Sequence, residues 1–403
     1  MCCCSSMRRR TLLLSGLGAA VTLPLLARQL LESSVFCAWR RQDQAALDHF
    51  ARIDAENSHG HHRGIALLAD AQGLTLLGST RRGREQGWLL RLTLTGELLW
   101  EHQLPELDDP CLLFADGNGY LIAGSHNESS PGRSYCAIVQ RVNQDGVATA
   151  TRIHPPGGVS TFQAFAECEG RRYLAGASGH KGRLAELRPD LSLAWDHEIP
   201  ELFQISCLVP IASGLLGLGA AEYNTRGPHS GRIVLIDRAG KIERSVSVYS
   251  QGFGHLLRAV RLTDGRIIAV GKRQEQESGS IRGWMVELSE EGAIRQQSLF
   301  GSALTAVSSI PGGGYAVAGV ALGEKDPTLR QVVIRRCLPG QPVRELRLGL
   351  EVGVWVEDMV AFSDGSLVLL GISSRLGDGK TNLWVARVGA NDSVVWEHGF
   401  GTA

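Results

Sequence analysis

Seven short apolar runs, each ending in glycine, recur along the chain and constrain its fold more than any other feature. The first reads Leu74-Thr-Leu-Leu-Gly78 and the last Leu367-Val-Leu-Leu-Gly371, and consecutive glycines of the set are 43 to 52 residues apart. An internal period of this length is typical of solenoids, propellers and other repeat arrays. The repeat glycines are Gly78, Gly124, Gly176, Gly219, Gly271, Gly319 and Gly371.

Each repeat contains four short apolar runs that predict β-strands. In the last repeat these runs cover residues 355–362, 367–372, 383–388 and 394–398, and Asp-Gly separates the first two. Asp-Gly between apolar runs is a strong β-hairpin signal, and runs of this length are too short for helices. Four antiparallel strands repeated seven times predict an all-β fold, a seven-bladed β-propeller of four-stranded antiparallel blades, over residues 59–403.

Two segments show the repeat motif most fully. Residues 312–319 read GGGYAVAG, and residues 87–100 read GWLLRLTLTGELLW. They resemble exported bacterial β-propeller repeat proteins, whose blades read roughly DGGYIVAG, a loop, and D-x-W-x-x-K-L-D-x-x-G-x-x-x-W. The resemblance covers residues ~60 to 400 and implies the fold, but it does not imply a particular activity.

Three tryptophans add a weaker likeness to quinoprotein-like propellers. Trp100, Trp195 and Trp396 each begin a Trp-acid-His pattern near the end of a repeat. A quinone dehydrogenase of that group would have eight blades and vicinal cysteines in the mature chain, and this sequence shows neither. We expect the indoles to pack between neighbouring blades and the acid-His pairs to lie on the surface.

The N-terminus has the layout of an export signal. Three arginines precede residues 11–26, an uncharged run that is shorter than the roughly 20 residues of a membrane span. Arg9-Arg10 before this run resembles a twin-arginine signal, which implies a bacterial protein exported in the folded state. We expect residues 1–37 to be an export signal or signal-anchor of undetermined cleavage site, residues 38–58 to be a linker or short helix, and the protein to be periplasmic or otherwise exported.

Charge and cysteine spacing exclude several classes of function. The chain has 41 Lys+Arg and 41 Asp+Glu. Because a nucleic-acid partner requires a basic surface, none is expected, and membrane contact is expected only through an uncleaved N-terminal segment. The cysteines that follow the signal form no C-x-x-C pair, so we expect buried apolar cysteines, with one disulfide as the alternative. No motif requires a cofactor or indicates a catalytic nucleophile.

One face of the predicted propeller carries long, varied connections, and the other carries tight turns. The first, here named the long-loop face, holds the connection into strand one and the loop between strands two and three of each blade. Functional residues concentrate on such loops. Candidate ligand-binding residues there are His61, His62, His126, His180, His229, His255, Arg81 and Arg82.

Histidine is the commonest metal ligand, and the densest histidine cluster is His59, His61 and His62. No acidic residue and no regular ligand spacing accompany it, so a solvated loop without metal is the competing interpretation. The arginine pair at residues 81–82 would suit an anionic ligand or an acidic partner surface, and an ordinary solvated loop is again the alternative.

Three functions remain open on the sequence alone. The first is an exported non-catalytic β-propeller that binds a partner protein of the cell envelope, or an extended ligand, through its long-loop face. The second is a periplasmic metal- or cofactor-dependent enzyme, or its accessory protein, with a histidine-containing site at the channel mouth. The third is an adhesin or glycan-binding protein, which the low content of 24 aromatic residues disfavours.

Overall fold

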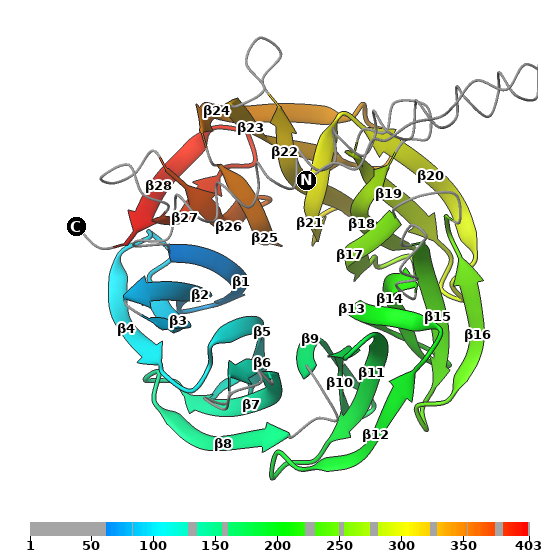
Figure 1. Ribbon diagram of the computed structural model, residues 1–403. Helices are drawn as coiled ribbons and strands as arrows, with labels where there is room; N and C mark the ends of the chain where they lie inside the picture. The colour runs from blue at the N-terminus through cyan, green and yellow to red at the C-terminus, as the bar shows by residue number, and fades with distance from the viewer. Residues whose placement is uncertain are drawn as a thin grey trace, which may run out of the picture. The chain divides into compact units, whose positions relative to one another are not determined.

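The strands form seven four-stranded antiparallel sheets arranged as the blades of a ring, so the predicted propeller is confirmed (Figure 1). The computed structural model describes residues 62–82, 84–127, 135–154, 160–221, 230–249, 254–274, 281–322, 329–352, 354–374 and 382–401. All of them belong to one compact unit, residues 57–403. The predictions for the export signal and the linker lie outside these residues. No helix in the described part is long and apolar enough to cross a membrane.

The first four blades follow one another along the chain, and in each the first strand is innermost. Blade 1 consists of β1 (His62–Asp70), β2 (Gly73–Arg82), β3 (Arg84–Leu92) and β4 (Leu98–Leu104). Blade 2 consists of β5 (Asp109–Asp116), β6 (Gly119–Asn127), β7 (Tyr135–Asn143) and β8 (Ala148–His154). Blade 3 consists of β9 (Ser160–Cys168), β10 (Arg171–Ser178), β11 (Lys181–Leu187) and β12 (Leu193–Ile199). Blade 4 consists of β13 (Leu202–Ile211), β14 (Gly214–Ala221), β15 (Gly231–Asp237) and β16 (Ile242–Ser247).

The last three blades repeat this order and complete the ring. Blade 5 consists of β17 (Gly254–Arg261), β18 (Ile267–Gln274), β19 (Ile281–Leu288) and β20 (Ile294–Phe300). Blade 6 consists of β21 (Ser302–Ile310), β22 (Gly314–Leu322), β23 (Leu329–Cys337) and β24 (Arg344–Val352). Blade 7 consists of β25 (Trp355–Ala361), β26 (Leu367–Ser373), β27 (Asn382–Val388) and β28 (Val394–Phe400).

Each repeat glycine lies opposite a β-bulge in the innermost strand of its blade. In blade 6, Leu304 pairs with Gly319 and Ala306 pairs with Ala318, which leaves Thr305 as the extra residue. The bulge brings the carbonyl group of Ala303 against the glycine, so a Cβ at position 319 would overlap its oxygen. The same overlap with an innermost-strand carbonyl oxygen occurs at all seven repeat glycines. The glycine period in the sequence therefore reflects close backbone approach at a repeated bulge.

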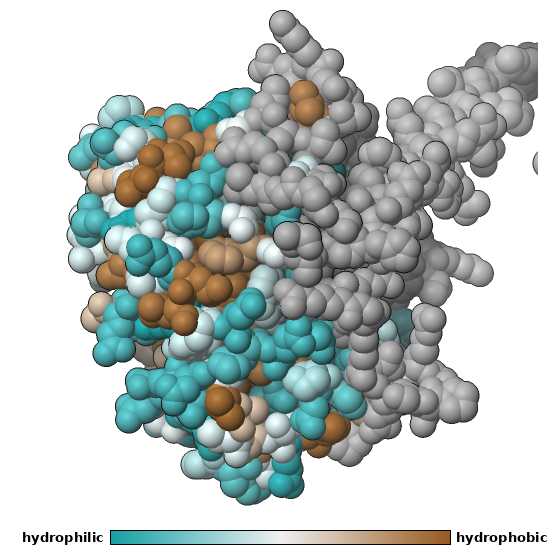
Figure 2. Space-filling model, turned by 90° about the vertical axis from the view of Figure 1, so that its left-hand side faces the viewer, coloured by the Kyte–Doolittle hydropathy of each residue, from teal (hydrophilic) through white to brown (hydrophobic). Residues whose placement is uncertain are grey.

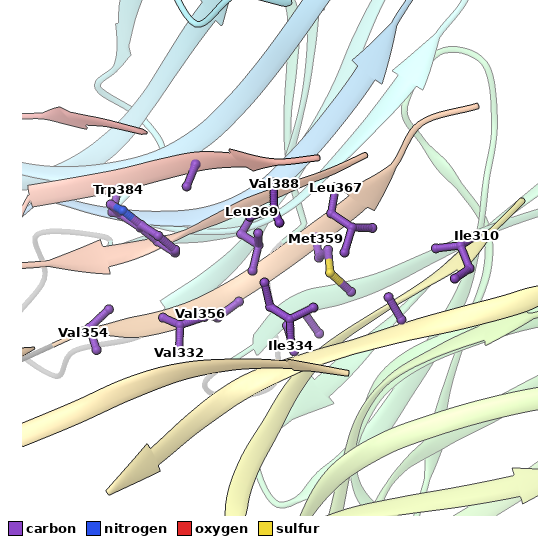
Figure 3. Close-up of a cluster of buried hydrophobic side chains, with 14 residues drawn as sticks. Ile310, Val332, Ile334, Val354, Val356, Met359, Leu367, Leu369, Trp384 and Val388 are labelled. Carbon is purple, nitrogen blue, oxygen red and sulfur yellow. The ribbon is translucent and has the colours of Figure 1, made fainter. Parts of the chain in front are cut away.

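The core lies between neighbouring blades. Figure 3 shows one such layer, in which Val332 and Ile334 of β23 face Val356 of β25 and Leu369 of β26. All four side chains are almost fully buried. Alternating strand residues supply apolar side chains to both faces of each sheet, so every blade is stabilised by burial against its two neighbours.

The outer rim of the ring is mixed in character. Figure 2 shows hydrophilic residues interspersed with small hydrophobic groups on the side of the ring that it displays. Exposed apolar residues in the outermost strands include Leu98 and Leu99 of blade 1 and Val394 and Val395 of blade 7.

The tryptophans of the outermost strands dock on the turn of the next blade, as expected from the sequence. Trp100 lies against Gly146, Trp195 against Gly240, and Trp396 against Gly96. These glycines have φ values of +81°, +85° and +89° in the tight turns between strands three and four, a region that side chains disfavour. Hydrogen instead of a side chain also leaves the space that the indole occupies.

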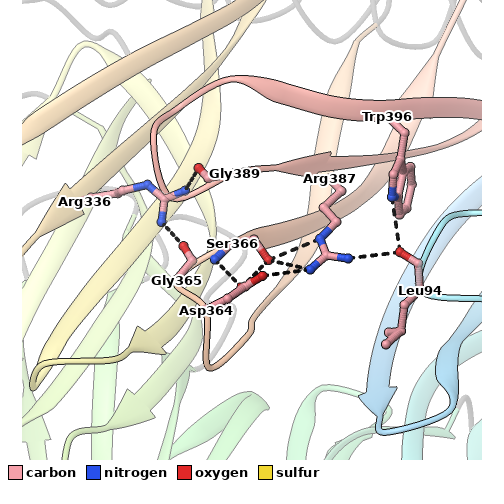
Figure 4. Close-up of polar contacts among 8 residues, drawn as sticks. All are labelled: Leu94, Arg336, Asp364, Gly365, Ser366, Arg387, Gly389 and Trp396. Carbon is pink, nitrogen blue, oxygen red and sulfur yellow. Dashed lines mark hydrogen bonds and ion pairs between the residues drawn. The ribbon is translucent and has the colours of Figure 1, made fainter.

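Side chains close the ring between blades 7 and 1 without exchange of a strand. Within the described residues, each of these two blades is made of four consecutive strands. The backbone N–H of Leu67 donates to Asp358 Oδ2 at 2.8 Å. Arg387 Nη1 and Trp396 Nε1 both donate to the carbonyl oxygen of Leu94, at 3.1 and 3.2 Å (Figure 4). An apolar cluster shared by the two blades completes the contact.

Buried polar side chains also link neighbouring blades. Arg336 of β23 has a side chain that is only 3% exposed, and it forms an ion pair with Asp392 of blade 7 at 2.7 Å. It also donates to the carbonyl oxygens of Gly365 and Gly389, at 2.7 and 2.9 Å (Figure 4). One arginine thus fixes two turns of the next blade.

The described cysteines are free thiols: no disulfide joins Cys111, Cys136, Cys168, Cys207 and Cys337. This agrees with the interpretation of these residues as structural, apolar side chains, and the alternative of a disulfide is not realised among them.

Candidate functional site

The innermost strands begin at the long-loop face and bring one polar position per blade toward the ring axis. This position lies 15 or 16 residues before each repeat glycine, next to the bulge. The residue that follows it is apolar or glycine in every blade. The seven residues at the polar position are Arg63, Asp109, Thr161, Gln204, His255, Ala303 and Trp355.

Charged side chains from several blades come close together near the axis. Arg258 of β17 acts electrostatically on Cys111 of blade 2, Cys207 of blade 4 and Glu357 of blade 7. Such effects act over short range, so these side chains converge from different parts of the ring. We name this group the axial cluster, which comprises Arg63, Asp109, Arg258, Lys272, Glu357 and Asp358.

Part of the axial cluster is internally compensated. Arg63 Nη2 and Asp109 Oδ1 form a 2.8 Å ion pair between blades 1 and 2, with side chains 42% and 48% exposed. Asp358 accepts the backbone N–H groups of Leu67 and Met359 at 2.8 and 2.9 Å. Burial raises the pKa of Asp358, and the nearby positive charge of Arg258 opposes this rise. These groups organise the site and have little capacity left for a ligand.

Two cations of the site lack a carboxylate partner within the described part of the chain. Lys272 of β18 and Arg330 of β23 are partly buried and make neither an ion pair nor a side-chain hydrogen bond there. Both contact the indole of Trp355: Lys272 Nζ lies 4.8 Å and Arg330 Cζ lies 5.7 Å from the ring centroid. A cation–π contact compensates only part of the lost hydration of a cation.

Burial leaves its mark on the ionisation of these groups. It lowers the pKa of Lys272, an effect that Glu357 opposes and that the positive charge of Arg330 increases. Burial also lowers the pKa of Arg330 and raises that of Glu357. Partly desolvated charges without direct partners are typical of binding sites, where a ligand supplies the missing interactions.

A second polar group lies beside the axial cluster, on β13 and β17. His255 Nε2 accepts hydrogen bonds from Ser206 Oγ at 2.7 Å and from Gln204 Nε2 at 3.0 Å. This nitrogen is therefore engaged within the protein. Burial, and next the charge of Asp109, raise the pKa of Cys111 to about 12, so its thiol stays protonated and is a weak nucleophile.

The structure distributes the other histidines predicted from the sequence among separate contacts. His62 begins β1 and is buried, with its ring 5.2 Å from that of Trp88. His126 Nδ1 is 2.8 Å from the carbonyl oxygen of Glu106. His180 stacks on Phe203 of the next blade, at a centroid distance of 6.4 Å.

The remaining predicted site residues fall at or beyond the limits of the description. His59, His61 and His229 lie outside the described residues, and so do the side chains of Arg81 and Arg82, whose backbone ends β2. Among the residues whose positions are described, no group of three His, Cys, Asp or Glu side chains could hold a metal ion. A metal site that includes the outlying histidines stays a prediction.

Sequence reasoning missed most of the axial cluster. Of its members and their neighbours, only His255 was singled out, because attention fell on loops and on histidine. A usable signal was present: aligning the repeats on their glycines places Arg63, Asp109 and Trp355 in one column. That column interrupts strands that otherwise read as apolar.

Comparisons with known proteins support the fold and extend no further. No known protein family and no curated protein matches the chain. A puromycin-hydrolysing peptidase of Mycobacterium tuberculosis is 11% identical with a TM-score of 0.52, over 85% of this chain and 53% of that one. The propeller domain of the Trilobed protease from Pyrococcus furiosus, described as having an open velcro topology, is 10% identical with a TM-score of 0.50, over 84% and 97%. A protein of unknown function from Bacteroides caccae is 13% identical with a TM-score of 0.43, over 85% and 94%. Since all identities are low, the chain shares with these structures the β-propeller fold alone.

Proposed function

We propose that this protein is an exported, non-catalytic β-propeller that binds a partner protein or an extended ligand through its long-loop face. The observation that carries the proposal is the pair of partly buried cations, Lys272 and Arg330, held on Trp355 without carboxylate partners in the described part of the chain. A ligand that supplied those partners would recover electrostatic energy that the free protein lacks.

The position of the cluster favours an extended ligand. Arg63 belongs to blade 1, Lys272 to blade 5 and Arg330 to blade 6, so a ligand that contacts all three extends over several blades. The contributing strands are rigid and their side chains are held by neighbouring blades, which limits the ordering cost of binding. Propeller faces of this kind position recognition groups around a fixed scaffold.

Photo-crosslinking tests the choice of face. A photoreactive residue would replace Leu322 or His180, both exposed at the long-loop face, and Gln72 or Asp145, both exposed in tight turns of the opposite face. In cells that express the protein, adducts of a defined mass are expected from the first pair and not from the second. Adducts that form only from the tight-turn positions would contradict the proposal, as would no adduct from either long-loop position.

Cell fractionation tests export separately. The motivating observation is Arg9-Arg10 before an uncharged run. The intact chain is expected in the periplasmic fraction, and a variant with both arginines replaced by lysine is expected to stay in the cytoplasm. Retention of the intact chain in the cytoplasm would show that the N-terminal segment is not an export signal.

A further inference from the structure

We infer that the axial cluster recognises a carboxylate of a peptide, bound between Lys272 and Arg330 beside the ring of Trp355. The inference deepens the proposed function by naming the chemical class of the ligand. It rests on the convergence of three blades at one point of the long-loop face.

The two cations are placed to share one anion. Lys272 comes from blade 5, Arg330 from blade 6 and Trp355 from blade 7, and both cations lie within 6 Å of the same indole centroid. Two like charges this close repel each other, and neither has an acidic partner among the described residues. A carboxylate between them would remove the repulsion and accept charge-assisted hydrogen bonds from both.

The neighbouring carboxylates select against other anions. Asp109, Glu357 and Asp358 lie in the same cluster as the cations, so both signs of charge face the ring axis. A nucleic acid or a doubly charged phosphate would be repelled by these acids. A peptide carries a single carboxylate together with N–H groups, and Asp109 and Glu357 are suited to accept those N–H groups.

Trp355 adds an apolar surface that suits a peptide. Its indole is partly exposed and lies at the start of β25, where the innermost strand meets the long-loop face. Aromatic side chains provide large contact areas at low entropic cost and are enriched at recognition sites. Charge of both signs around an aromatic ring thus fits a peptide segment better than a simple ion.

Peptide binding by the full chain tests the inference. A synthetic octapeptide library would be offered in three arms: with a free C-terminal carboxylate and no acidic residue, as the C-terminal amide with one Glu, and as that amide with Gln in place of Glu. The first two arms distinguish a terminal from a side-chain carboxylate. The best binders of each arm would be titrated by calorimetry.

Matched variants separate the site from general charge effects. Lys272→Met and Arg330→Gln remove the cations, while Lys241→Met and Arg295→Gln make the same changes at exposed positions of the tight-turn face. Binding is expected in one of the carboxylate arms and not in the Gln arm. Each site variant should raise Kd by about tenfold or more, as expected for the loss of a charge-assisted hydrogen bond, and the control variants should bind like the parent.

The inference is overturned if no arm binds, if the Gln arm binds as tightly as the acids, or if the site variants bind like the parent chain. Adducts at Leu322 or His180 alongside any of these results would leave the long-loop face as the binding face and would remove only its assignment to a carboxylate.

Discussion

Replacement of a single repeat glycine by alanine should destabilise the ring, and Gly319 offers the cleanest case. A Cβ there would overlap the carbonyl oxygen of Ala303 and lie 2.7 Å from its carbonyl carbon and 2.9 Å from Cα of Leu304. All three atoms belong to the backbone, so no side-chain rotation can relieve the overlap. The bulge opposite Gly319 would have to move outward and weaken its ladder hydrogen bonds.

The cost follows from three contributions. Overpacking of a rigid site costs about 1–3 kcal/mol, and strained hydrogen bonds add about 1 kcal/mol. The lower entropy of the unfolded chain with alanine returns about 0.4–1 kcal/mol. The expected net loss is therefore about 3 kcal/mol. With an unfolding entropy of about 2.1 cal/mol/K per residue over roughly 340 residues, this lowers Tm by about 4 °C.

Thermal unfolding followed by circular dichroism measures this shift. Gly301→Ala is the matched control, because it adds the same methyl group in the same region and meets no atom within 4 Å. The control should melt within a degree of the parent. If Gly319→Ala and Gly301→Ala melt at the same temperature, close approach at the bulge is not the reason for the glycine repeat.

Three further predictions address pH dependence, buried charge and ring closure. Burial, followed by the charges of nearby arginines, lowers the pKa of His154 to about 4; the unfolded state therefore takes up a proton first, and stability should be full above pH ~6.5 and fall by up to about 3 kcal/mol as the pH drops to ~4, a loss that His154→Gln should largely abolish in denaturant titrations. Arg336→Met should cost about 3 kcal/mol, because it breaks a buried ion pair, whereas Arg347→Met, at an exposed pair, should cost less than about 1 kcal/mol; equal losses would refute this ranking. Trp396→Phe removes a hydrogen bond across the ring closure and should lower stability by about 1 kcal/mol more than Trp100→Phe, whose indole N–H donates to no described residue; no difference in Tm would count against that bond as a closure contact.

The sequence predicted the fold because each blade repeats the same local requirement. Gly78 and Gly371 are almost 300 residues apart, yet each is required by an innermost-strand carbonyl that its own blade places against it. Requirements of this kind are set by a few neighbouring residues, so they recur at a regular period that can be read without knowledge of the fold. Asp-Gly turns gave the same information about strand ends.

The candidate site was harder to predict because its residues meet only through the geometry of the ring. Lys272, Arg330 and Trp355 lie on strands of three blades, at different positions within those blades. No spacing in the chain marks their proximity. Histidines at similar loop positions seemed more promising, but His126 and His180 each contact their own local surroundings in the structure.

The closure of the ring bears on how such a chain can change. Because each blade is one uninterrupted stretch of sequence, a duplicated or deleted gene segment of about fifty codons adds or removes a whole blade and leaves no strand without its sheet. A circularly permuted chain that starts at any other blade would build the same seven sheets and would need only to re-form the side-chain contacts now made between Leu94, Arg387 and Trp396. The junction of blades 7 and 1 is thus the one place where the ring is joined without a peptide bond, and a pulling force on the chain ends would part it there first.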